Sequence, residues 1–302
     1  MVATLPTGLQ PAKSGTVAIL LTWFLPGAGH IYLGRIAFGL TALVLLSGLY
    51  ALGLFLSEGM TFEFLDPELR SPFATLLTPE AGNLSALFYQ MKHYGFGAGP
   101  REWPEFIRVG SYLCALSGIG NACLAADAAC AARATGSALV LTRPKLSPAL
   151  QTFAAWAVPG LGHWLQGRKL RAVLVAGLLL GLFLLGCVLA EYSNLSRLRH
   201  FYYWGGQFLV GLPAAAMEYA QRDMRITHTI RWEDAGLLFG SVAGLLNVLA
   251  MLDVYAWAEA TAFGDNPLTP RGESAKAKDK ARSTAPSGVA GAGPSGGGGA
   301  RT

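Results

Sequence analysis

Charged residues are scarce in this chain. Asp, Glu, Lys and Arg make up 14% of its 302 residues, whereas soluble domains usually carry about 25%. This shortage excludes an ordinary water-soluble globule. The net charge of +5 does not indicate nucleic-acid binding, because the Lys and Arg residues lie beside apolar segments and in the C-terminal tail, where they act as orientation signals in membrane proteins. No nucleic-acid partner is expected.

Cysteine is also rare, and its positions lack the spacing of a metal site. The four cysteines all lie in apolar segments, at Cys114, Cys123, Cys130 and Cys187. No spacing among them matches zinc ligands. They are expected to be small apolar packing residues, and no metal or other cofactor is predicted.

Catalytic motifs are missing as well. The sequence has no HExxH motif and shows no Ser-His-Asp set or paired catalytic carboxylates. The Gly27-x-Gly29 and Gly160-x-Gly162 pairs lack the preceding strand and the downstream acidic residue of a dinucleotide loop. We therefore predict that the chain is not an enzyme.

Long uncharged apolar runs are what the chain has in abundance. They cover residues 36–56, 172–190 and 236–252, and residues 109–126 form a fourth candidate rich in Gly, Ala and Ser. About 20 apolar residues in a helix cross the hydrocarbon core, and the bilayer requires every backbone group to be paired. The runs predict transmembrane helices; buried helices of a large soluble core are the alternative.

One 13-residue segment of the sequence occurs twice, and we call its two copies the repeated phrases. Residues 23–35, WFLPGAGHIYLGR, return at 156–168 as WAVPGLGHWLQGR, with seven of thirteen positions identical. A second pair follows in the same order, because Gly118-x-x-Asn121-x5-Asp127 returns as Gly244-x-x-Asn247-x5-Asp253. The first pair is offset by 133 residues and the second by 126, so the repeat indicates a tandem duplication whose copies differ in an insertion.

The fold predicted from these runs is all-α, a polytopic transmembrane helical bundle of about four to seven membrane segments. Its expected parts are a polar leader at 1–14, unit one at 15–133, a linker at 134–148, unit two at 149–260 and a disordered tail at 261–302. Residues 201–219 are expected to form either a further span or an interfacial helix.

Ten residues of each repeated phrase, 26–35 and 159–168, are called the turn motifs. Their shared positions are Pro26, Gly27, Gly29, His30, Gly34 and Arg35 in unit one, and Pro159, Gly160, Gly162, His163, Gly167 and Arg168 in unit two. Because proline interrupts a helix, each apolar segment is expected to dip into the membrane and return, or to lie at its surface. A full crossing is the alternative.

The aspartates near the ends of two predicted helices are the sharpest candidate site residues. An ionisable group in a spanning helix is costly and is by default a functional hypothesis. We expect Asp127 to pair with Arg35 or His30, and Asp253 with the corresponding Arg168 or His163. A proton- or ion-coupled role is the alternative for these groups, as is metal binding or proton transfer for the histidines. The neighbouring Asn121 and Asn247 require partners on another helix.

Positive charge predicts the topology. Arg35, Arg143, Arg168 and residues 276–282 are expected on the cytoplasmic face, with the acidic residues of 63–80 on the opposite face. Arg197 and Arg199 do not fit this scheme. Small residues at Gly177-x3-Gly181 and in the row Ser117, Asn121 and Ala125 predict close helix packing.

At the turn motifs the chain resembles the bacterial TM-two (two-transmembrane-helix) domain family. In that family a short apolar segment and a Gly-rich turn with His or Asp precede an aromatic-Leu-Gly-Arg step, a spanning helix and an Asp near its end. The match here is PGAGHIYLGR followed by Asp127, and the second copy followed by Asp253. A large insertion departs from the family pattern, and Leu165 replaces Tyr32. The whole is similar to duplicated bacterial membrane proteins of unknown function.

These patterns favour a multi-pass protein of the bacterial inner membrane whose partner is the lipid bilayer. The first functional hypothesis is a structural or assembly module that binds other membrane proteins through small-residue helix faces. The second is a small transporter or channel built from two repeats, since transporters also pair broken segments in repeated halves.

Overall fold

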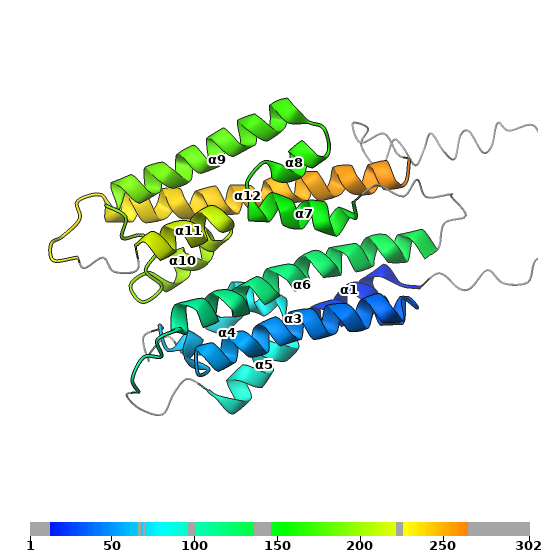
Figure 1. Ribbon diagram of the computed structural model, residues 1–302, viewed down its shortest axis with the longest axis horizontal. Coiled ribbons are helices and arrows are strands. Elements are labelled where there is room, and N and C mark those ends of the chain that lie inside the picture. The colour runs from blue at the N-terminus through cyan, green and yellow to red at the C-terminus, as the bar shows by residue number, and fades with distance from the viewer. Residues whose placement is uncertain are drawn as a thin grey trace, which may run out of the picture.

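The computed structural model describes residues 13–65, 68, 70–95, 101–135, 146–221 and 226–264. Every regular element within these residues is a helix, as Figure 1 shows. The all-α prediction is therefore confirmed. The tail from residue 265 onward and most of the linker lie outside the described residues.

Four helices are long and apolar enough to cross a membrane. They are α3 (Ile36–Leu56), α6 (Ile107–Thr135), α9 (Lys169–Leu189) and α12 (Glu233–Ala262). The 21 residues of α3 and of α9 extend about 31 Å at 1.5 Å per residue, which matches a hydrocarbon core of about 30 Å. The four predicted runs are confirmed as the spans of a transmembrane bundle.

The short helices that precede the spans also correspond between the units. Unit one has α1 (Gly15–Phe24) and α2 (Ala28–Tyr32), and unit two has α7 (Pro148–Ala157) and α8 (Leu161–Leu165). Helices α7, α8 and α9 start and end 133 residues after α1, α2 and α3, whereas α12 starts 126 residues after α6. The structure thus repeats with the same two offsets as the sequence, which confirms the duplication.

The two spans of each unit are antiparallel and touch through glycine. A methyl group added at Gly53 of α3 would lie 2.6 Å from the Gly110 carbonyl oxygen of α6. The same holds in unit two, where a methyl at Gly186 would lie 2.7 Å from the Gly236 carbonyl oxygen. Such contact allows the backbones to approach closely without lipid between them.

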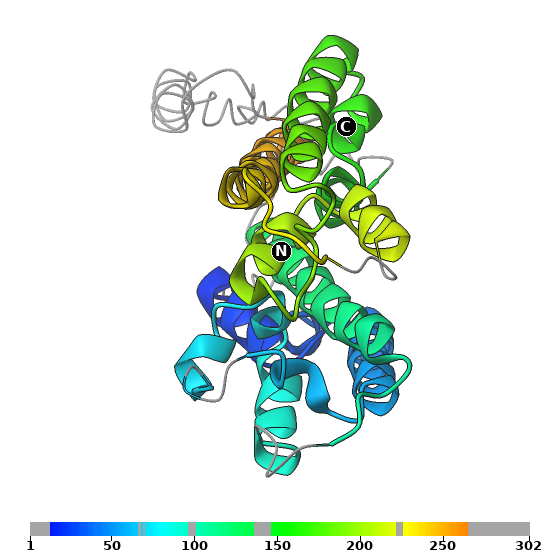
Figure 2. The same ribbon diagram turned by 90° about the vertical axis from the view of Figure 1, so that its left-hand side faces the viewer.

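Arg35 at the start of α3, Arg133 in the last turn of α6 and Arg168 at the start of α9 lie on one side, where α12 ends. We call this side the basic end and the other side the opposite end. Tyr255 of α12 donates its hydroxyl to the Ala126 carbonyl oxygen of α6 at 2.8 Å, and Arg133 pairs with Glu259 at 3.3 Å. Because both contacts join corresponding parts of α6 and α12, the two units are parallel, as Figure 1 shows. Figure 2, which looks down the spans, shows the two units side by side.

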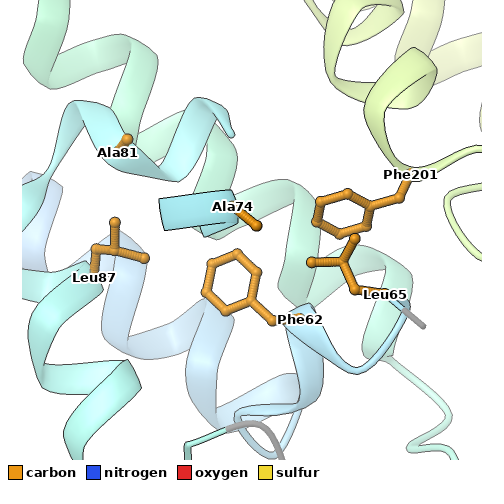
Figure 3. Close-up of a cluster of buried hydrophobic side chains, with 6 residues drawn as sticks. All are labelled: Phe62, Leu65, Ala74, Ala81, Leu87 and Phe201. Carbon is orange, nitrogen blue, oxygen red and sulfur yellow. The ribbon is translucent and has the colours of Figure 1, made fainter. Parts of the chain in front are cut away.

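The insertion of unit one folds into short helices at the opposite end. They are η1 (Met60–Phe62), α4 (Pro72–Thr75), η3 (Pro79–Gly82) and α5 (Leu84–His93). A compact apolar cluster holds them together (Figure 3), made of Phe62, Leu65, Ala74, Ala81, Leu87 and Phe201. Phe201 comes from unit two, so this cluster also joins the units.

The insertion of unit two forms a helical hairpin. Helix α10 (Phe201–Phe208) and helix α11 (Leu212–Ala220) are separated at Gly211, whose φ is 89°. Residues 201–219 are therefore two short helices, and neither is long enough to span the membrane. A second apolar cluster of Ala115, Trp156, Trp204 and Phe208 packs this hairpin between the units.

Candidate functional site

The turn motif of unit one folds back to the end at which it started. Helix α1 stops at Phe24, and Gly27 takes a φ of 78°, a left-handed conformation that glycine adopts without strain. The Lys13 ammonium then donates to the Tyr32 carbonyl oxygen at 2.6 Å. Since residue 13 precedes α1 and residue 32 ends α2, the segment is re-entrant, and the full-crossing alternative is wrong.

The turn motif of unit two has the same geometry. Gly160 has a φ of 87°, and Gln166 after α8 donates to the Gln151 side chain in the first turn of α7 at 3.0 Å. Each motif ends at a second left-handed glycine, Gly34 or Gly167, followed by the arginine that starts the span. The shared glycines and prolines therefore shape a re-entrant turn.

In unit one the turn is tied to α6 by a buried carboxylate. Arg35 Nη1 donates to Asp127 Oδ2 at 3.2 Å, and the Asp127 side chain is 8% exposed. His30 is fully buried, and its Nε2 lies 3.7 Å from the same oxygen, which is too long for a hydrogen bond. The predicted pairing of Asp127 with Arg35 is confirmed. Phe38 covers the group, because its ring meets His30 edge to face and the Arg35 guanidinium lies over it.

In unit two the equivalent carboxylate has more donors. Asp253 Oδ2 lies 2.7 Å from Arg168 Nη2 and 3.1 Å from His163 Nε2. Arg171 approaches the other carboxylate oxygen at 3.1 Å. The predicted pairing is again confirmed, but the contribution of Arg171 was not foreseen, although its position one turn after Arg168 offered a signal.

The two asparagines bind the tips of segments that enter from opposite ends. Asn121 donates its amide to the Thr22 carbonyl oxygen at 2.7 Å and to the Gly82 carbonyl oxygen at 2.8 Å. Thr22 belongs to the turn segment from the basic end, whereas Gly82 belongs to the insertion. Asn247 likewise donates to the Leu209 carbonyl oxygen at 2.9 Å, in the tip of the α10–α11 hairpin. The expected partners on other segments are confirmed.

Each asparagine lies fourteen residues into its helix, about 21 Å along the axis. This is near the middle of the membrane. There Trp23 donates its indole N–H to the Ala81 carbonyl oxygen at 2.8 Å, and a methyl added at Gly211 would lie 1.9 Å from the Trp156 carbonyl oxygen. Each unit therefore contains two re-entrant segments that meet at what we call the midpoint junction, a feature that the sequence did not indicate.

Small residues serve two different roles in the structure. Ser117 donates to the Leu46 carbonyl oxygen at 2.8 Å, and Ser117, Asn121 and Ala125 are buried inside the bundle as expected. Gly177 and Gly181 have no atom within 4 Å of an added methyl group. The expectation that this pair tightens the bundle is wrong, because its face of α9 points outward.

The charges at the two ends follow most of the predicted topology. Arg35 and Arg168 share the basic end, while Glu63 lies at the opposite end; Arg143 and residues 276–282 fall outside the described residues. The two arginines that did not fit are both paired at the opposite end, Arg197 with Glu80 at 2.8 Å and Arg199 with Glu233 at 3.0 Å.

The described residues contain no group of three or more His, Cys, Asp or Glu side chains arranged to hold a metal ion. The arginine of each turn motif is occupied by the aspartate of the span, whereas His30 Nε2 and His163 Nδ1 are buried without a hydrogen-bond partner among the described residues. Together, the ion pairs of the turn motifs lock each re-entrant turn onto a spanning helix.

Comparisons with known proteins agree with the internal repeat. No curated protein and no solved structure gives a significant match to the chain. A family model described as a family of unknown function (DUF6677) matches residues 17–138 and again residues 150–267, once in each unit. The chain belongs to the DUF6677 family.

Proposed function

We propose that this membrane protein is an interaction module that binds another transmembrane helix through α9 and does not itself perform catalysis. The proposal rests on one observation above all. Gly177 and Gly181 lie one turn apart on α9 with open space beside both. Glycines at this spacing let two helices approach closely in a membrane.

The surroundings of this glycine pair favour a helix as its occupant. The flanking side chains Leu174, Leu178 and Val188 are more than half exposed. Together with the two glycines they form a shallow apolar groove along the helix, which we call the α9 face. Packing in lipid depends on close van der Waals contact, so a partner helix gains more from such a groove than from a uniformly bulky surface.

Unit one offers a natural comparison for this surface. Val44 and Gly48 of α3 occupy the positions of Gly177 and Gly181, so the glycine pair is absent there. The neighbouring Leu45 and Leu178 also correspond, and each is 65% exposed. The α3 face is therefore a matched control that faces outward without the groove.

The midpoint junctions argue against a conduit through either unit. Backbone carbonyls and the asparagine amides fill them, and an added methyl at Gly118 would lie 2.0 Å from the Pro79 carbonyl oxygen. A small transporter remains the second proposal. It is favoured by the meeting of re-entrant segments from opposite ends, because such segments resemble the broken helices that transporters use.

The proposal also includes which membrane the protein occupies and which end faces the cytoplasm. Lys and Arg concentrate on cytoplasmic loops, so the basic end is assigned to the cytoplasm. The resemblance to TM-two domains supports a bacterial inner membrane.

A photo-crosslinking pair tests the module. A photoreactive phenylalanine analogue is placed at Leu178 or at Leu45 in the full-length protein, in its native membrane. We expect position 178 to give one protein adduct of defined mass and position 45 to give lipid adducts only. An adduct of twice the chain's mass would identify the partner as a second copy.

Two glycine variants serve as matched controls. Gly181→Leu should abolish the adduct from position 178, because the branched side chain fills the groove, whereas Gly48→Leu on α3 should leave it intact. Equal adducts from both positions, or no effect of Gly181→Leu, would contradict the proposal. Solute flux into liposomes containing the pure protein would instead favour the transporter.

A further inference from the structure

A hollow lies between the two units at the opposite end, far from the turn motifs. Its volume is about 210 Å³, and an adjoining hollow of about 160 Å³ shares several of its lining residues. Much of the wall is apolar and comes from both units, with Phe64, Trp103 and Ile107 on one side and Leu195 and Leu198 on the other. The larger hollow is smaller than the about 300–1,000 Å³ of pockets for drug-sized ligands, so it suits a smaller molecule or the head of a larger one.

Buried hydrogen-bond donors line this hollow without acceptors. Arg197 Nη2 donates to Glu80 Oε1 at 2.8 Å, yet Arg197 Nε and Nη1 have no partner among the described residues. The Arg197 side chain is only 3% exposed. The Ser111 hydroxyl on the same wall is also buried and unpartnered. Buried polar groups are nearly always hydrogen-bonded, so these donors point to an acceptor inside the hollow.

The guanidinium group of Arg197 is held in place before any ligand arrives. It lies 4.3 Å from the centre of the Trp204 ring and 5.0 Å from that of Phe201. Stacking of this kind fixes the plane of an arginine, so that each free N–H group keeps a set direction in which it can donate to an oxyanion.

The charges around the hollow leave a positive excess. Glu80 balances Arg197, and Glu233 balances Arg199. Arg108 lines both hollows and has no acidic partner within ion-pair distance among the described residues. The remaining carboxyl group is Glu218, which accepts a hydrogen bond from Trp204 Nε1 at 2.9 Å.

Glu218 does not fully cancel this excess. Burial raises the pKa of Glu218 to about 7, although the Trp204 hydrogen bond and the charges of Arg197 and Arg108 act in the opposite direction. The carboxyl group is therefore neutral in a large fraction of molecules near neutral pH.

We propose that this hollow binds a small amphiphilic oxyanion, a carboxylate or phosphate on a short apolar stem. The oxyanion accepts a hydrogen bond from a free N–H group of Arg197 and another from Arg108 at the mouth. The stem packs against the aromatic and aliphatic wall. Such a group is supplied either by a dissolved organic acid or by the head of an anionic lipid.

Calorimetric titration of the full-length protein in nanodiscs tests the site. Hexanoate is titrated into protein in phosphatidylcholine nanodiscs, with hexanamide as its uncharged counterpart. We expect saturable hexanoate binding at least about tenfold tighter than hexanamide binding, since hydrogen bonds to charged groups are the stronger ones. Loss of hexanoate binding in nanodiscs that also contain phosphatidylglycerol would identify the lipid head as the natural source. Binding that persists there would identify a dissolved acid.

Two exposed arginines at the opposite end provide the variants. Arg108→Gln should weaken hexanoate binding about tenfold, while Arg231→Gln, which changes the same net charge away from the hollow, should leave it unchanged. Neither side chain has a structural ion pair among the described residues, so both variants are expected to fold. Equal behaviour of the two variants would overturn the proposal, as would equal binding of hexanamide or no saturable binding at all.

The pH dependence gives a readout that a purely structural arginine would not produce. The groups that face Glu218 are Arg108 and Tyr112 on α6, Arg197 and Arg199 in the segment before α10, and Trp204 on α10. Ionisation of Glu218 adds a like charge beside the oxyanion, so hexanoate should bind more tightly at pH 6 than at pH 8. Glu218→Gln should remove this difference, and a pH dependence that survives in this variant would contradict the assignment.

Discussion

Asp127 in unit one and Asp253 in unit two occupy the same position of corresponding helices, yet water reaches them very differently. The Asp127 side chain is 8% exposed and has one arginine within ion-pair distance. The Asp253 side chain is 43% exposed and contacts two arginines and a histidine. The exposures of the two arginines are reversed, at 45% for Arg35 and 11% for Arg168. The carboxylate is therefore the buried partner in unit one, and the arginine is the buried partner in unit two.

One position accounts for much of this difference. Phe38 in unit one corresponds to Arg171 in unit two, at the repeat offset of 133. Phe38 contacts His30 edge to face and lies under the Arg35 guanidinium, so it covers the ion pair. Arg171 instead brings a further charge and the solvent that surrounds it. The units therefore share their backbone design and differ in how much the stability of each carboxylate depends on its arginine partner.

The largest expected effect concerns what the units share. Gly118→Ala and the equivalent Gly244→Ala should each destabilise the protein by about 3 kcal/mol or more, because overpacking forces the backbone to move. The added methyl would lie 2.0 Å from the Pro79 carbonyl oxygen in the first case and 1.9 Å from the Gly206 carbonyl oxygen in the second. Thermal unfolding in detergent measures both. Gly48→Ala, where the site is open, is the control, and a similar loss there would contradict this expectation.

The next effect should be larger in unit one than in unit two. Removing one partner of a buried ion pair costs about 3–5 kcal/mol, whereas a surface pair contributes about 0–1 kcal/mol. Since Arg35 is 45% exposed and Asp127 is buried, we expect a loss of about 2 kcal/mol for either Asp127→Asn or Arg35→Gln.

A double-mutant cycle separates pairing from other causes of this loss. The double variant should be hardly less stable than either single one, because residues in contact are not additive. Two losses that simply add would argue against the pair. If Asp127 carries protons instead, Asp127→Asn should leave stability unchanged and abolish transport.

The same substitutions in unit two should have a smaller effect. Asp253→Asn is expected to cost about 1 kcal/mol, between the values for exposed and for buried pairs, because the Asp253 side chain is 43% exposed whereas that of Arg168 is 11% exposed. Arg168→Gln should cost no more, since His163 and Arg171 remain beside the carboxylate. Equal losses in the two units, measured by the same thermal unfolding, would show that exposure does not govern these pairs.

The smallest effect is expected for Arg171→Gln. Both partners of this contact are exposed, the arginine side chain to 54%, so the loss should be about 0.5 kcal/mol or less. Added salt should reduce the difference from the unchanged protein further, since exposed charges are screened. A loss as large as that of Arg35→Gln would mean that Arg171, not Arg168, anchors the turn.

The sequence was sufficient to predict the features that depend on local pattern. The spans followed from uncharged apolar length, the re-entrant turns from Pro26 and Pro159, and the pairs from the cost of placing Asp127 and Asp253 in helices. Each of these inferences required the sequence of only one unit, and the repeat allowed the same inference to be made a second time.

Features that join distant segments could not be predicted in this way. The second re-entrant segment of unit one is built from short helices around η3, with no apolar run long enough to suggest membrane entry. Glu80 and Arg197 lie 117 residues apart and in different insertions, so no spacing relates them. The outward direction of Gly177 and Gly181 also depends on which side of α9 faces α12, and both sides of that helix are apolar.

Cysteine accessibility labelling tests the central claim, that each unit enters and leaves the basic end through a re-entrant turn before its span. In a variant without the four native cysteines, single cysteines are placed at Lys13, Ile36, Glu58, Lys169 and Glu191. Positions 13, 36 and 169 should react with an impermeant reagent from the cytoplasmic side only, and positions 58 and 191 from the other side only. Labelling of positions 13 and 36 from different sides would contradict the account.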